Sequence, residues 1–111
     1  MSEVLDAKVL DDLIEHIGAE SVREVVALFI GECRDLTLVM AAPGANRAAV
    51  GRAAHSLKSS AGQLGALALS DAALAVESAA GTAAAALPEL VAALAECAAR
   101  TEAALAERLA P

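Results

Sequence analysis

The sequence has no tryptophan or tyrosine and a single phenylalanine, Phe29. Aromatic and β-branched residues favour strands, whereas alanine, which is abundant here, is the strongest helix former. A long apolar run is also missing, because the alanine-rich stretches are short or interrupted by charges. These absences exclude a membrane-spanning segment, argue against a β-sheet core and favour an all-α fold.

Positive charge is scarce, since eight Lys and Arg stand against fifteen Asp and Glu, for a net charge of -7. The broad basic face that nucleic-acid binding needs is therefore absent. Cys33 and Cys97 fall in apolar helical patterns, as buried reduced thiols do, and no metal-ligand spacing is present. The first residues of the sequence show no basic region followed by an apolar segment and a cleavage site, so we expect no oxidising compartment for the cysteines. We expect a soluble cytoplasmic protein without a metal site, a nucleic-acid partner or a membrane partner.

The length of 111 residues predicts one domain over residues 1–111. Apolar residues recur at helical spacing in five segments. We expect helices over 7–17, from Val22 to about Ala41, from Asn46 to near Gly65, over 67–80, and from Pro88 to about Leu109. The expected architecture is an antiparallel up-down four-helix bundle with an additional short N-terminal helix.

Local signals define the ends of these helices. Asp6 and Asn46 are expected to be N-caps, and Ser21 with Glu24 matches a capping box. Gly18 and Gly81 are expected to end the first and fourth helices, and Pro88 suits a first turn. The second helix is expected to face the core through Val22, Val25, Val26, Phe29, Cys33 and Leu36.

One segment, residues 54–66, places His55 and Lys58 on the third helix among small side chains. It belongs to a stretch, Leu36 to Ser70, that contains no Asp or Glu; its formal charges are Arg47, Arg52 and Lys58. At 100° per residue, His55 lies about 140° from Val50 of the apolar stripe, so its imidazole should face outward.

The neighbours of His55 on the outward face are Gly51, Ser59 and Gly62, which leave room for a partner to reach the ring. Glycine inside a helix costs about 1 kcal/mol relative to alanine, so two on one face need a reason. An accessible imidazole beside a lysine suits chemistry on an anion such as phosphate. The alternative is an ordinary histidine and lysine on a solvated helix face.

The segment resembles the core motif of the histidine-containing phosphotransfer (HPt) domain family, His-x-Leu-Lys-Gly-Ser-Ser-x-x-x-Gly-Ala. The residues in register are His55, Leu57, Lys58, Ser60, Gly65 and Ala66. Ser59 departs from the usual glycine, and this could alter the local fit to a partner. The order and lengths of the expected helices also match, so the resemblance spans nearly the whole chain.

The resemblance implies that His55 takes a phosphoryl group from an aspartyl phosphate on one receiver domain and passes it to another. Lys58 would then steady the phosphoryl oxygens. Many family members have a Glu or Gln at the position of Glu77, twenty-two residues after His55. A hairpin turning near Gly65 would put positions 55 and 77 at about the same level, so Glu77 could accept the Nδ1–H of His55.

The resemblance also implies the partners: response-regulator receiver domains and a hybrid histidine kinase, with Mg²⁺ on the receiver and no cofactor on this chain. The residues expected to contact a partner are Gly51, Arg52, Ser59, Gly62 and Phe29, although Phe29 also belongs to the expected core. The chain has no glycine-rich nucleotide loop, so we expect a monomeric phosphoryl carrier and not an ATP-dependent kinase.

Two alternatives remain open. The chain could be a helical adaptor that kept this fold and binds a signalling partner without phosphotransfer; the presence of both His55 and Lys58 argues against it. It could instead be an HPt domain excised from a hybrid sensor kinase. Because the sequence begins at Met1 and ends soon after the last helix, we expect a free-standing protein.

Overall fold

The computed structural model describes residues 3–110, which form five helices and no strand. They are α1 (Ala7–Ile17), α2 (Ala19–Ala41), α3 (Arg47–Gln63), α4 (Leu67–Thr82) and α5 (Leu87–Arg108). The ends of the expected domain, residues 1–2 and 111, lie outside the described residues. None of the five described helices is long and apolar enough to cross a membrane.

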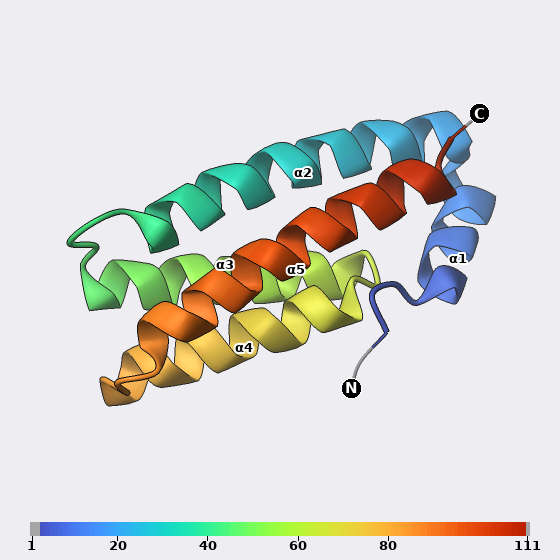
Figure 1. Ribbon diagram of the computed structural model, residues 1–111. Coiled ribbons are helices and arrows are strands. Elements are labelled where there is room, and N and C mark those ends of the chain that lie inside the picture. Colours follow the sequence, from blue (N-terminus) through green and yellow to red (C-terminus); the bar gives the residue numbers. More distant parts are fainter. Residues whose placement is uncertain (1–2, 111) are drawn as a thin grey trace.

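The four long helices form an antiparallel bundle, and the short α1 lies at one end of it (Figure 1). Helix α3 packs against α2 and α4, and α5 packs against the same two helices. Helices α3 and α5 therefore occupy opposite corners of the bundle. This arrangement confirms the predicted all-α four-helix bundle with an additional N-terminal helix.

Aliphatic side chains from several helices fill the interior. The fully buried leucines are Leu10, Leu57, Leu69, Leu94 and Leu105. Between α3 and α4 the core residues are small: Ala54, Ala61 and Ala73 are each 0% exposed. Because small side chains let helix axes approach closely, α3 and α4 pack more extensively against each other than any other two described helices.

The side of the core between α2 and α5 contains both cysteines and one polar residue. Cys33 and Cys97 are buried and unbridged, in agreement with the sequence prediction. Burial raises the pKa of the Cys33 thiol, which keeps it in the unreactive protonated form. Thr101, which the apolar pattern did not mark as inward, is 1% exposed. Its hydroxyl donates to the Cys97 carbonyl at 2.8 Å, so no polar atom is left unpaired there.

Three of the predicted helix-start signals are confirmed. The Asp6 carboxylate accepts from the Lys8 amide at 3.1 Å at the start of α1. The Asn46 side chain accepts from two amides of the first turn of α3, at 2.8 and 3.2 Å. Pro88 lies in the first turn of α5, where its missing amide hydrogen costs nothing.

The predicted capping box of Ser21 and Glu24 is wrong, because α2 begins at Ala19. Gly18 alone separates α1 from α2, with φ at +86°, and its amide donates to the Ile14 carbonyl at 2.8 Å. Because glycine tolerates this positive φ, Gly18 by itself connects the two helices. Ser21 therefore lies inside the first turn of α2 and not at the N-cap.

The prediction that Gly81 ends the fourth helix is also wrong, since α4 continues to Thr82. The C-cap is Ala83, whose φ is +54°. A glycine inside a helix costs about 1 kcal/mol, which is too little to end a helix that tertiary packing supports. Here the adjacent Ala79 and Ala80 are buried, and their packing keeps this turn helical.

The turn between α3 and α4 is held by the segment that precedes α1. The Asp6 amide donates to the Gly65 carbonyl at 2.7 Å, and the Ala68 amide donates to the Glu3 carbonyl at 3.0 Å. Gly65 has φ at +73°, and a Cβ there would lie 2.8 Å from the Val9 Cβ. This turn sets how far α3 and α4 run alongside each other, and therefore which of their residues meet.

Candidate functional site

His55 lies near the middle of α3 and its side chain is 63% exposed. The opposite face of the helix is buried through Val50, Ala54 and Leu57. The imidazole therefore points away from the core, as its angle around the helix predicts. A ring in this position can be reached by another macromolecule without any rearrangement of the bundle.

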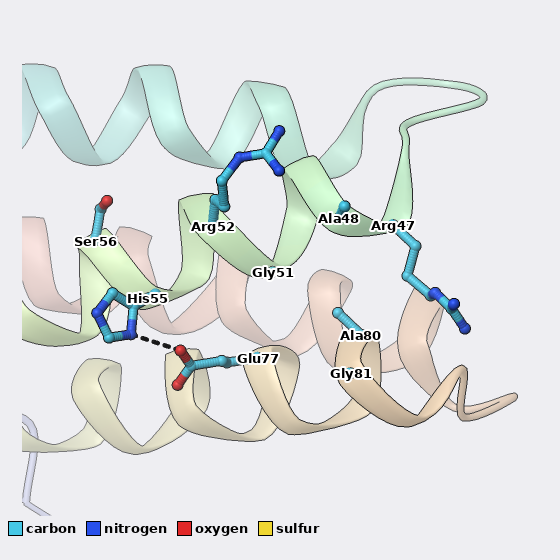
Figure 2. Close-up of a pocket in the computed structure, with 9 residues that line it drawn as sticks. All are labelled: Arg47, Ala48, Gly51, Arg52, His55, Ser56, Glu77, Ala80 and Gly81. Atoms are coloured by element: carbon cyan, nitrogen blue, oxygen red, sulfur yellow. Dashed lines mark hydrogen bonds and ion pairs between the residues drawn. The ribbon is translucent and has the colours of Figure 1, made fainter.

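The neighbouring helix supplies an acidic partner for this ring. Figure 2 shows Glu77 on α4 directed at His55, whose Nδ1 lies 2.6 Å from Glu77 Oε2. An ionised carboxylate can only accept, so Nδ1 is the atom that donates its hydrogen. In the neutral ring this leaves the Nε2 lone pair directed away from Glu77 and free of the proton.

Lys58, one helical turn after His55, contacts the same carboxylate. Its Nζ donates to Glu77 Oε1 at 2.6 Å, so Glu77 bridges the lysine and the histidine. The Lys58 ammonium, followed by the hydrogen bond from His55, holds the pKa of the Glu77 carboxyl below its usual range. Glu77 is therefore an anion at neutral pH, in the state that accepts both hydrogen bonds.

The Lys58→Ala variant should raise the pKa of Glu77 toward the ordinary glutamate value of 4.5, because its largest stabilising interaction is gone. A carboxyl ¹³C NMR titration measures this shift, and His55→Ala should produce a smaller one. An equal or larger shift in His55→Ala would contradict the assigned order of the two interactions. The pKa of Glu77 is lower in the folded chain than in the unfolded chain. The pairing of Glu77 with Lys58 and His55 therefore stabilises the fold at pH values above the unfolded pKa. This stabilisation is lost as the pH falls through the folded pKa.

The small residues around His55 leave its surroundings open and are not required for the approach of α4. A Cβ at Gly51 would lie 3.5 Å from the Ala80 Cβ, and one at Gly62 would lie 3.7 Å from the Ser70 Oγ. Both are ordinary contacts, so the glycines relieve no clash and leave surface open. Ser59 is exposed, so its side chain takes no part in the packing of α3 against the rest of the bundle.

A groove of about 650 Å³ opens between α3 and α4, immediately beside His55. Gly51, Ala80 and Gly81 are among the residues that line it, and Arg47 and Arg52 line it as well (Figure 2). The predicted contact residues Gly51 and Arg52 therefore share one concave surface with His55. Gly62 and Ser59 lie outside that lining, farther along α3.

The other flank of the site, along α2, corrects the expectation for Val25 and confirms that Phe29 belongs to the core. Val25 is 42% exposed, so its predicted place in the core is wrong. Phe29 is 6% exposed and packs in the core, which leaves little of its ring for a partner. The apolar surface there comes instead from Leu28, which is 76% exposed.

Several site features had no clear signal in the sequence. The Ser70 hydroxyl donates to the Lys58 carbonyl at 3.1 Å and ties α4 to the helix that presents His55. The Ser60 hydroxyl donates to Glu32 Oε1 at 2.9 Å and ties α3 to α2. Serine on a helix surface is common, so Ser70 does not stand out without knowledge of the facing helix. Ser60 is one of the motif residues in register, but its bond to Glu32 could not be predicted without the position of α2.

No cluster of three or more His, Cys, Asp or Glu side chains that could hold a metal ion occurs within residues 3–110. Comparison with protein families matches the Hpt domain over residues 24–108. This match covers α3, α4 and α5 completely and most of α2. Comparisons with curated proteins and with solved structures gave no match.

Proposed function

The chain belongs to the Hpt domain family, and on this premise we propose that His55 is its phosphorylated residue. Membership assigns the protein a phosphotransfer role in a phosphorelay, with receiver domains of two-component systems as partners. In our proposal His55 takes the phosphoryl group from an aspartyl phosphate of one receiver domain and passes it to a second receiver. The observation that supports this most directly is the exposed imidazole bonded through Nδ1 to Glu77.

The transfer chemistry follows from that hydrogen bond. Nε2 attacks phosphorus with its lone pair while the bond from phosphorus to the aspartate oxygen breaks, and the electron pair leaves with the carboxylate. Nδ1 keeps its proton, so the phosphorylated ring is cationic, and the adjacent Glu77 carboxylate stabilises that charge. Attack by the aspartate of the next receiver reverses these steps and restores the neutral ring.

Lys58 has a second task in this proposal. Its ammonium is bound to Glu77 before transfer, with the lysine side chain 29% exposed. The long flexible side chain can turn toward Nε2 and place its charge against the phosphoryl oxygens. Phosphoryl transfer needs little beyond alignment and such charge stabilisation.

The remaining components come from the partners. We propose that the receiver brings Mg²⁺ together with its aspartate, and that this chain works as a cytoplasmic monomer with no cofactor of its own. A hybrid histidine kinase supplies the phosphoryl groups, since this chain offers no glycine-rich loop for ATP. The adaptor alternative makes no use of the bonded His55 and Glu77 pair.

The decisive test mixes the protein with purified receiver domains of its source organism that hold ³²P-labelled aspartyl phosphate. Label should move to this chain and survive alkali but not acid, because a bond between nitrogen and phosphorus has that stability and an acyl phosphate does not. A wild-type chain that takes label from none of these receivers would refute the relay proposal and leave the adaptor role.

A further inference from the structure

Two arginines beside His55 have no role in the chemistry derived above. Arg47 and Arg52 are exposed, and among the described residues the guanidinium group of neither has a hydrogen-bond or ion-pair partner. Figure 2 shows Arg47 extending past Ala80 and Gly81 at one end of the groove, and Arg52 rising from the other side of α3. Arg34 and Arg108, in contrast, are bound to Glu102 and Asp11.

The charge around the groove differs from that of the whole protein. The chain carries a net charge of -7, yet residues 36–70 include no acidic residue. Among the described residues that line the groove, Glu77 alone carries a carboxylate, and it is already bound by Lys58 and His55. The groove is therefore a positively charged area on an otherwise acidic surface, and a carboxylate-rich partner is attracted here and repelled elsewhere.

We propose that this groove is a docking site for an acidic segment beside the phosphorylation site of the receiver domain, with Arg47 and Arg52 as its specificity-determining residues. This inference rests on the proposed function, in which the reacting group of the partner is a carboxylate next to Mg²⁺. Magnesium is held by carboxylates, so acidic side chains surround that aspartate. The guanidinium groups of Arg47 and Arg52, which both line the groove, pair with such carboxylates and align the aspartate with His55.

The shape of the groove suits an inserted segment. Gly81 contributes no side chain to the lining, and a Cβ added there would meet nothing within 4 Å. The space beside His55 is consequently open to a partner's backbone or short side chain. A larger residue at position 81 should fill the groove without straining α4, because the backbone there is an ordinary helix.

The first experiment removes the charge. Arg47→Ala/Arg52→Ala should slow transfer from the labelled receiver by about tenfold or more at low salt, since steering by charge acts on association. The matched control is Lys8→Ala/Arg100→Ala, which removes two exposed positive charges from α1 and α5 and should transfer like wild type. The difference should disappear in about 1 M salt, where the screening length is about 3 Å. Equal rates for the two double variants at low salt would overturn the proposal.

The second experiment fills the groove. Gly81→Leu should weaken receiver binding, measured by calorimetric titration, by about tenfold or more, the size of a lost central contact. The control is Gly31→Leu on α2, where a Cβ also meets nothing within 4 Å and which does not belong to the lining of this groove. Both variants should melt at or above the wild-type temperature, because leucine favours helix more than glycine does. Undiminished binding by Gly81→Leu would overturn the proposal.

An NMR titration identifies the occupant. Receiver domain should shift the Nε–H signals of Arg47 and Arg52, whereas inorganic phosphate alone should not. Shifts with phosphate and none with receiver would replace the proposal with a simple anion site. Failure of wild type to accept label refutes the proposed function itself, whereas wild-type transfer with unaffected groove variants refutes this inference alone.

Discussion

Replacing His55 with glutamine should abolish uptake of label from the receiver, by at least about a hundredfold, because the variant has no nucleophilic ring nitrogen. The glutamine amide can still donate to Glu77, so the surroundings of the missing ring are largely preserved. The free energy of unfolding should stay within about 0.5 kcal/mol of wild type, as expected for a side chain that is 63% exposed. Phosphorimaging measures the first effect, and urea unfolding measures the second.

The chain offers a matched control in its other histidine. His16 lies on α1, is exposed, and its Nδ1 lies 2.6 Å from the Asp12 carbonyl. His16→Gln should take up label at the wild-type rate, since among the described residues this ring contacts a backbone carbonyl and is not paired with a carboxylate as His55 is. Label that persists in His55→Gln, or that disappears in His16→Gln, would contradict the assignment of His55.

The Gly65→Ala variant should lose a large share of the protein's stability. The left-handed backbone costs alanine about 1–2 kcal/mol and overpacking adds about 1–3, so the loss is roughly 2–5 kcal/mol. The overpacking arises because the new Cβ would lie 2.8 Å from the Val9 Cβ and 3.0 Å from the Asp6 carbonyl oxygen. Urea unfolding followed by circular dichroism gives the change in free energy.

Gly44→Ala separates the two contributions to that loss. Gly44 has φ at +70°, close to the +73° of Gly65, but a Cβ there would meet nothing within 4 Å. This variant should therefore lose only the backbone part, about 1–2 kcal/mol. Equal losses in the two variants would show that contact of the α3–α4 turn with the α1 segment does not constrain position 65.

Local sequence signals predicted much of this fold. Asp6 and Asn46 cap helices as expected because capping depends only on residues within the same turn. The prediction failed at Gly81, where a local preference of about 1 kcal/mol was outweighed by burial of the adjacent alanines. It failed also at Ser21, because a single left-handed residue, Gly18, can replace a longer loop.

The candidate site divides in the same way. The outward direction of His55 follows from 100° per residue on one helix, and the sequence alone was sufficient for it. The exposure of Val25 could not be predicted, because the facing helix determines which part of an apolar stripe is covered; the burial of Phe29 in the same stripe was predicted. Hydrogen bonds such as that from Ser70 to the Lys58 carbonyl need the exact spacing of two helices.

The sequence by itself determined an all-α bundle, an acidic chain with a positively charged segment, and a histidine that faces outward from its helix. These properties depend on composition and on helical periodicity, which are local. The sequence also predicted the bond from His55 to Glu77, whereas the tertiary structure alone decided that Glu77 binds Lys58 as well, and that Arg47 and Arg52 share a groove with that histidine. Such contacts depend on how α3 and α4 align, and that alignment is set by a turn held against a third segment of the chain.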